Sequence, residues 1–599
     1  MPPFGAIIRR TSLALATALM PVAALAFDRF DLDVAGDDAD LRRALVGASL
    51  VAGAREAGTT DPRDLTAAAR ADYARLLNAL YAQGYYGGEI HILIDGREAA
   101  GLSPFAMPPR IGRIAIRVDP GPRFSFARTE VTPLPPAATT VPGFAPGEPA
   151  QSTVIRRAVE AGVSDWRDAG HAKADIAGQS VVADHRTATL DARIALAPGP
   201  LVRFGTLMLT TPSDVRSARI ARIAGLPEGE TFSPDALAEV AARLRRTGAF
   251  ASVALTEAET LGPGNTMDIG LAVTDEKPRR FGFGAELSSR DGLGLSAFWM
   301  HRNLLGGAER LRVDGAVSDI DGTFAGMDFS LAARLDIPAA FGTGTGAYVT
   351  AHADYTDDPA FRAIQGGAGA GVNRRFSETF EGEIGLAYRY SVTDDDLGRR
   401  VFSLLSVPGR FTWDRRDDPL DATSGFYVGG DIKPFYDLIG NTFGVRGWVD
   451  LRAYLGLGAG GTVLAGRVQA GSVIGAGAAA VPPDYLFFSG GGGTVRGFPY
   501  QSLGVDLGGG VTVGGRSFLG ASGEIRARVT DTIGLVGFAD VGYLGADGFF
   551  GAGGGYQVGA GVGLRYDTGI GPVRLDLAMP VAGPGGDGLQ FYVGIGQSF

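Results

Sequence analysis

Apolar residues recur at every second position through much of the second half of the chain. Residues 384–392 place Ile, Leu, Tyr, Tyr and Val in alternation with Gly, Ala, Arg and Ser, and residues 558–565 alternate Val, Ala, Val and Leu with glycine and arginine. A period of two predicts β-strands that have one apolar face and one small or polar face. The closing residues follow the same pattern: Phe591, Val593, Ile595 and Phe599 alternate with Tyr592, Gly594, Gly596 and Ser598.

Residues 277–599 are therefore expected to form a transmembrane antiparallel β-barrel. Lipid requires an apolar outer face and a backbone whose hydrogen bonds are all made within the protein, and a closed sheet meets both conditions. At about 20 residues for each strand with its share of loop, this region gives about 16 strands. A soluble β-sandwich is the alternative, but it uses fewer and shorter alternating runs. Glycine marks the same boundary, since 67 of the 92 glycines lie in residues 277–599.

The first half of the chain contains a unit that occurs three times, in which a capped helix ends at a glycine and leads into two strands. The helices are expected from Asp61-Pro62 to Gly84, from Ser152 to Gly170, and from Ser233-Pro234 to Gly248. Each unit is long enough to form its own small core, although any single one could be a plain spacer. Three α+β modules are therefore expected, over residues 27–112, 113–200 and 201–276.

Residues 1–26 resemble an export signal. Arg9 and Arg10 precede an apolar stretch over residues 13–25, and Ala24-Leu25-Ala26 has the small-residue form of a cleavage site. An uncleaved membrane anchor is the competing interpretation, but the apolar stretch is short for a membrane span. Export and a barrel together predict the outer membrane, with the amino-terminal modules in the periplasm.

Composition excludes several classes of function. The chain has no cysteine, which removes disulfides, thiolate metal sites and cysteine nucleophiles. A net charge of −10 argues against nucleic acid as a partner. No hydrolase, metalloprotease or phosphate-binding motif is present, and the two G-x-G-x-x-G matches do not open helices after strands. We therefore expect no enzymatic activity, no cofactor and no metal.

A glycine-rich segment over residues 489–515 interrupts two of the expected strands and carries Val495-Arg496-Gly497-Phe498. If this loop folds into the barrel, the guanidinium of Arg496 must pair with an opposite charge there, because a lone guanidinium in a narrow pore is poorly solvated. Glu524 and Asp540 alternate with apolar residues and are the candidate partners. Two alternatives stay open: the loop arginine could be exposed to solvent, or the carboxylates could pair only with Arg526 or Arg528.

These segments resemble the BamA/TamA superfamily of outer-membrane assembly proteins, whose barrel follows POTRA modules. Residues 495–498 resemble its loop signature, and residues 563–566 with 571–574 resemble its penultimate hairpin. Residues 588–596 are similar to the TamA branch in particular, which three modules also favour. A strand-turn motif of the superfamily is matched by Asp414, Arg416, Asp417, Pro419 and Gly425, whose aspartates lack the spacing of a calcium loop.

The resemblance implies an insertase that helps autotransporters or other barrel proteins to enter the outer membrane. Incoming strands would be templated at a seam between residues 280–289 and 589–599, where Gly594 and Gly596 weaken the last strand. It further implies that Glu524 and Asp540 hold Arg496, and that the terminal Phe599 belongs to an assembly signal. The implied partners are unfolded outer-membrane polypeptides, outer-membrane lipid and a TamB-like protein anchored in the inner membrane. A two-partner-secretion transporter, a phospholipid bridge, a passive porin and a barrel enzyme are the alternatives.

Overall fold

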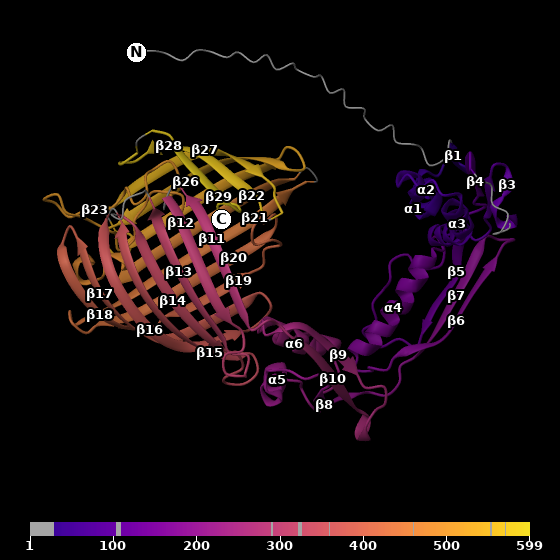
Figure 1. The fold of residues 1–599 in the computed structure, drawn as a ribbon, viewed down its shortest axis with the longest axis horizontal. Helices are drawn as coiled ribbons and strands as arrows, with labels where there is room; N and C mark the ends of the chain where they lie inside the picture. The colour runs from indigo at the N-terminus through magenta and orange to yellow at the C-terminus, as the bar shows by residue number, and fades with distance from the viewer. Residues whose placement is uncertain are drawn as a thin grey trace, which may run out of the picture. The chain divides into compact units, whose positions relative to one another are not determined.

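The computed structural model describes residues 29–102, 110–288, 292–320, 326–358, 360–458, 461–551, 554–569, 571–586 and 588–599. The expected export signal, residues 1–26, lies outside them. No helix among the described residues is both long and apolar enough to cross a membrane. The chain divides into two compact units, the first holding residues 1–203 with two short later segments and the second holding the rest. Figure 1 shows the ribbon of both units.

The first module is built on a four-stranded sheet with the order β1-β4-β2-β3. Its elements are β1 (Arg29–Val34), α1 (Ala39–Ala48), α2 (Leu50–Glu56), α3 (Pro62–Gln83), β2 (Glu89–Ile94), β3 (Arg97–Glu98), η1 (Ala99–Gly101) and β4 (Arg113–Asp119). Helix α3 begins after the capping side chain of Asp61 and ends at Gly84, which is left-handed, as the sequence predicts. The predicted boundary after residue 112 is wrong, because β4 pairs with both β1 and β2 and completes this sheet.

The second module has a three-stranded sheet with the order β5-β7-β6 and one long helix. Its elements are β5 (Ser125–Thr132), α4 (Ser152–Asp168), β6 (Asp175–Asp184) and β7 (Thr189–Ala197). Gln151, and not Ser152, is the residue before the first helical turn, and its side chain makes no capping hydrogen bond. Helix α4 packs Val154, Ile155 and Ala158 against the sheet, so this core is separate from that of the first module.

Most of the third module belongs to the same compact unit as the barrel, the exceptions being residues 230–234 and 263–266. It contains β8 (Arg203–Leu209), α5 (Ser217–Ala224), α6 (Pro234–Arg246), β9 (Phe250–Glu257), η2 (Pro263–Asn265) and β10 (Thr266–Asp275), with the sheet order β8-β10-β9. Its apolar core includes Ala308 and Ala339 from two barrel turns. The Arg219 guanidinium donates to the carbonyl of Pro338 at 2.6 Å. Module 3 is therefore docked on one end of the barrel, which we call the module end.

The second half forms one antiparallel sheet of 17 strand segments in sequence order. The segments are β11 (Arg279–Ser288), β12 (Gly292–His301), β13 (Arg310–Ile320), β14 (Asp328–Ile337), β15 (Thr345–Asp358), β16 (Phe361–Arg375), β17 (Phe380–Asp395), β18 (Gly398–Ser406), β19 (Gly409–Asp414), β20 (Gly425–Asp437), β21 (Thr442–Leu457), β22 (Thr462–Ile474), β25 (Ser517–Arg528), β26 (Ile533–Gly545), β27 (Gly555–Tyr566), β28 (Val573–Ala582) and β29 (Gln590–Ile595). Segments β18 and β19 both lie between β17 and β20, so they are two halves of one strand broken at Pro408. The expectation of about 16 strands is confirmed.

The outer face of the sheet is apolar, as the alternation predicts. On β17, Ile384, Leu386 and Tyr388 are exposed. On β28 and β29, Leu575, Phe591 and Val593 are exposed. Charged residues occupy the intervening positions that face the interior, among them Asp450 and Arg467, which lie 2.8 Å apart. This is the pattern that a bilayer outside and a polar lumen inside require.

A buried carboxylate ties together two helices of the first module. Asp72 on α3 is fully buried and accepts hydrogen bonds from Ser49 Oγ at 2.6 Å, from Leu50 N at 2.6 Å and from Val51 N at 3.1 Å. It therefore satisfies the free N–H groups that begin α2, which would otherwise be buried without partners.

We predict that Asp72→Ala destabilises the first module by about 3 kcal/mol, because three donors lose a charged acceptor. Urea-dependent proteolysis of the full-length protein in detergent would measure this, since the barrel stays resistant while the module opens. Asp37→Ala, at an exposed position of the same module, is the matched control. Equal protease resistance of the two variants would contradict the assigned role of Asp72.

Candidate functional site

A long loop between β22 and β25 fills part of the lumen. It contains η3 (Ala478–Ala480), η4 (Pro483–Tyr485), β23 (Val505–Asp506) and β24 (Thr512–Val513). Tyr485, Leu503 and Val513 from the loop pack with wall residues such as Phe435 and Phe518 in one apolar cluster. The Arg389 guanidinium of β17 holds Asp484 at 2.6 Å. The loop is therefore packed against the inner wall.

Arg496 is the deepest charged residue of this loop, with 3% of its surface exposed. Its Nε and Nη2 bind the two carboxylate oxygens of Asp540 at 2.7 and 2.9 Å, and its backbone N–H donates to Asp540 as well. Its Nη1 binds Glu524 at 2.8 Å and Asp576 at 3.1 Å. The guanidinium carbon lies 3.5 Å from the centre of the Phe538 ring. One planar cation is thus held by three carboxylates and an aromatic face.

The two predicted partners, Glu524 and Asp540, both contact Arg496. Glu524 also pairs with Arg526 at 2.9 Å, so the competing pair exists beside the loop contact and does not replace it. Sequence reasoning missed Asp576 of β28, which also pairs with Arg565 at 2.5 Å. Alternation with Leu575 and Leu577 marks Asp576 as inward-facing, but only the closed sheet brings β28 opposite the loop.

The loop fits the wall through positions that have no space for a side chain. Gly497 has φ +99°, and a Cβ there would lie 2.6 Å from the carbonyl of Met579. A Cβ on Gly559 would lie 1.8 Å from the carbonyl oxygen of Arg496. Val495 and Phe498 are fully buried on either side. Tyr592 Oη accepts from Gly497 N at 3.0 Å and donates to Phe498 O at 3.2 Å. The four-residue motif is therefore fixed by backbone fit as well as by charge.

The C-terminal residues depart from the predicted strand. Strand β29 ends at Ile595, and Gly596 turns the chain with φ +85°. Phe599 then lies in the interior, 7% exposed, beside Tyr454, and its main-chain oxygen accepts a hydrogen bond from Arg526 at 3.1 Å. The Ser598 hydroxyl hydrogen-bonds Glu524. The expectation that Phe599 continues the apolar outer face is wrong, because the glycine turn points the last residues inward, where Arg526 can bind the chain end.

The strand-turn motif lies at the module end and contacts this tail. Arg416 binds Asp414 at 2.7 Å and the carbonyl of Pro419 at 3.1 Å. The backbone N–H of Gln597 donates to Leu420 O at 3.1 Å. Gly425 is required at the turn exit, since its φ is +93° and a Cβ would lie 2.0 Å from the carbonyl of Arg415.

Asp417 in this turn is a capping residue. Its carboxylate accepts from the hydroxyl and backbone N–H of Thr423 and from the N–H of Ser424. Burial by itself would raise the pKa of Asp417, but these hydrogen bonds outweigh it and lower the pKa to about 2. No group of three metal-ligating side chains occurs among the residues that the structure describes. The contacts of Asp414 and Asp417 are those of arginine pairing and of turn capping.

Comparison with known proteins agrees with this architecture. Residues 303–599 match the Omp85 superfamily domain. The crystal structure of BamA from Haemophilus ducreyi lacking POTRA domains 1–3 matches with a TM-score of 0.62 at 16% identity, covering 79% of this chain and 99% of that one. This chain is a POTRA-barrel protein of the BamA/TamA type. Two weaker likenesses are to CdiB from Acinetobacter baumannii (TM-score 0.48, 12% identity, 79% of this chain and 90% of that one) and to CdiB from Escherichia coli (TM-score 0.47, 15% identity, with the same coverage).

As a member of the Omp85 superfamily, the protein resides in the outer membrane, with its POTRA modules in the periplasm, and acts in protein insertion or transport. The module end of the barrel is then its periplasmic end. The loop that carries Arg496 enters from the opposite, extracellular end, because strands alternate in direction from β11 onward. Assignment to the TamA branch stays a prediction.

We predict that Arg496→Ala frees the loop, because three buried carboxylates lose their common partner. Glu524→Ala and Asp540→Ala should act in the same direction, with Asp540→Ala the stronger of the two since it removes three of the hydrogen bonds. Each charged hydrogen bond contributes about 1.5 to 3 kcal/mol. Protease cleavage within residues 489–515 of the folded barrel measures the effect, and Glu378→Ala at an exposed turn is the control. Unchanged cleavage in all three variants would show that the network does not hold the loop.

The close packing of the loop backbone can be tested separately from the ion pairs of Arg496. Gly559→Ala should displace the loop although every ionic partner of Arg496 remains, because the added methyl would overlap the Arg496 carbonyl oxygen. Gly537→Ala on the adjacent strand β26 has no atom within 4 Å of the added methyl and should leave cleavage unchanged. Equal loop protection in the two variants would contradict the close approach.

Proposed function

We propose that this protein is an outer-membrane insertase of the TamA kind, which promotes the folding and insertion of autotransporters or other β-barrel proteins. It receives unfolded polypeptides in the periplasm and templates their strands at the barrel seam. No chemical reaction is required, because an incoming strand in lipid needs partners for its N–H and C=O groups, each of which costs several kcal/mol when left unpaired.

The observation that carries the proposal is the state of the seam. The sheet runs from β11 to β29 in sequence order, and no ladder joins these two strands within the described residues. Both contain residues whose Cα atoms approach within 8 Å, so they are neighbours without regular pairing. Strand β29 has 6 residues and β11 has 10, which leaves part of β11 without a possible partner in β29. An unpaired edge of this kind is a template for another strand.

The periplasmic modules supply a second feature that suits extended polypeptides. Strand β6 is at the edge of its sheet and most of its 10 residues are exposed. Its exposed side chains include Ile176 and Val182, of which Val182 is 60% exposed. Such an edge can accept an added strand through main-chain hydrogen bonds. This supports a role in receiving unfolded chains, and a TamB-like inner-membrane partner and outer-membrane lipid complete the proposal by family resemblance.

The loop-filled lumen argues against a passive porin. The apolar cluster around Phe435 and Phe518 and the Arg496 network place the loop across the interior, where a porin needs open water. The three periplasmic modules would also have no role in a simple pore.

We predict that a cysteine pair across the seam, one in residues 280–288 and one in 589–597, oxidises readily at the correct register. Neighbouring strands lie about 5 Å apart, within reach of disulfide geometry, and the chain has no native cysteine to interfere. The locked barrel should stay folded but lose assembly of an autotransporter in reconstituted vesicles, and reductant should restore it. A pair across the fully laddered β26 and β27 is the control.

Full assembly activity in the oxidised seam variant would exclude strand templating at this seam. Activity lost equally in the control pair would show that any added disulfide in the barrel is harmful, which would also count against a special role for β11 and β29.

A further inference from the structure

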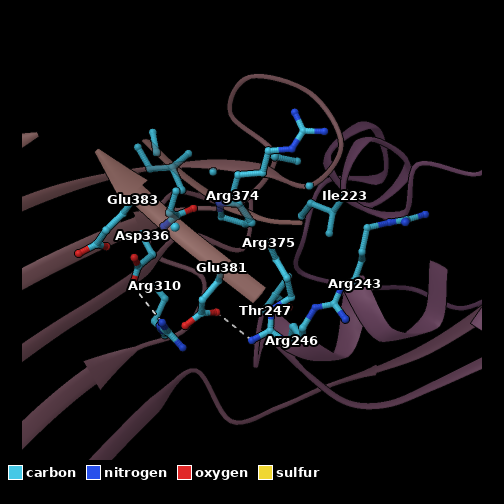
Figure 2. Close-up of a pocket in the computed structure, with 18 of the residues that line it drawn as sticks. Ile223, Arg243, Arg246, Thr247, Arg310, Asp336, Arg374, Arg375, Glu381 and Glu383 are labelled. Atoms are coloured by element: carbon cyan, nitrogen blue, oxygen red, sulfur yellow. Dashed lines mark hydrogen bonds and ion pairs between the residues drawn. The ribbon is translucent and has the colours of Figure 1, made fainter. Parts of the chain in front are cut away.

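A cavity of about 630 Å³ lies between module 3 and the barrel turns at the periplasmic end, and it is a candidate ligand site distinct from the seam and the loop network. Its walls come from α5 and α6 of module 3 and from the periplasmic ends of the strands β13 to β17 and β19. Figure 2 shows its lining residues, with Arg243 and Arg246 from module 3 and Arg310 and Arg375 from the barrel. The volume falls in the range of about 300 to 1,000 Å³ that ligand sites occupy.

Most charged side chains of the cavity stand on the lumenal face of the barrel. On β14, Phe329 and Leu331 are exposed on the outer face, so Arg334 and Asp336, an odd number of positions away, lie on the inner face. On β19, Phe411 is outward and Arg410 has the inward parity. A ligand would therefore reach these groups from the periplasm or the lumen, and lipid in the bilayer would not.

Arginine outnumbers carboxylate in this lining by seven to three. The carboxylates are shared: Asp336 lies 3.0 Å from Arg310 and 2.8 Å from Arg334, and Glu383 lies 3.1 Å from Arg334 and 3.6 Å from Arg410. Each guanidinium has five N–H donors, so sharing leaves donor capacity unused. The Arg410 side chain is 68% exposed, which makes that capacity accessible.

Arg375 and Arg246 add further N–H donors on two sides of the cavity. Arg375 at the end of β16 pairs with Glu381 at 3.0 Å and stays 41% exposed. Arg246 at the end of α6 pairs with Glu239 of its own helix at 2.5 Å. Arg246 belongs to module 3 and Arg375 to the barrel, so a ligand bound to both would span the junction of module 3 with the barrel (Figure 2).

We propose that this cavity binds acidic segments of the incoming polypeptide at the periplasmic mouth of the lumen. The planar guanidinium groups of the arginines match the geometry of carboxylates. Asp336, Glu381 and Glu383 lie among the arginines and can accept hydrogen bonds from the N–H groups and basic side chains of a peptide. Because most of the charged side chains lie on the lumenal face, the cavity favours a polypeptide arriving from the periplasm over a lipid headgroup. The proposal rests on the proposed function for the identity of its ligand, but the binding can be measured without any assembly step.

The test uses full-length protein in detergent and two synthetic labelled peptides, one rich in Asp and Glu and one with Asn and Gln at the same positions. Fluorescence anisotropy should show binding of the acidic peptide only, weakening as salt screens the charges. Arg375→Gln with Arg410→Gln should raise Kd at least about tenfold, as the loss of two charge-assisted contacts implies. Arg156→Gln with Arg399→Gln removes the same charge at exposed sites elsewhere and should leave Kd unchanged.

Heat-modifiable migration of each variant checks that the barrel is folded, and single substitutions replace the double one if it is not. Equal Kd in the cavity and control variants, or no preference for the acidic peptide, would overturn the proposal. Arginine-dependent binding of inorganic phosphate or of anionic phospholipid vesicles, with no binding of the acidic peptide, would overturn it as well. Peptide binding that needs the cavity arginines in a protein inactive in assembly would uphold the site and refute the proposed function instead.

Discussion

Backbone hydrogen bonding in lipid is the constraint on which the rest of this structure depends. A chain that crosses a bilayer as strands must pair every N–H and C=O group, and a sheet can do so only by closing on itself. Here each strand from β11 to β28 is paired on the side facing its successor, and only the junction of β29 with β11 lacks a ladder among the described residues. Within the described part of the barrel, this junction is therefore the edge at which the proposed function would accept another strand.

Inside the barrel, the long loop is held by ion pairs as well as by apolar packing. Arg496 is buried among Glu524, Asp540 and Asp576, while Arg526 and Arg565 balance the remaining charge of these carboxylates. Burying an ion costs free energy unless it is paired with an opposite charge. Displacing the loop would leave buried charges without partners, so the network holds the loop in one position. Ser598 and Phe599 join the same network, which links the loop to the end of the chain that forms the seam.

At the periplasmic end, module 3 and the barrel share an apolar core through Ala308 and Ala339, and most of this module is part of the same compact unit as the barrel. The turn that contains Asp417 and Leu420 holds the inward tail, and the arginine-rich cavity lies at the junction with module 3. Polar contacts thus gather where polypeptide would arrive, while the apolar outer face is left to the bilayer.

The sequence by itself determined the elements and the location. Alternation of period two predicted the strands, since side chains of a strand point to opposite faces, and Asp61 with Gly84 marked the limits of α3. The alternating sequence also marked Glu524 and Asp540 as inward-facing. The tertiary structure decided what depends on distant segments: Asp576 joins Arg496 only because β28 closes beside β27, and β4 completes the first sheet by pairing with β1. It also turned Phe599 inward, because a left-handed glycine and a buried arginine outweigh the apolar pattern that local alternation suggests.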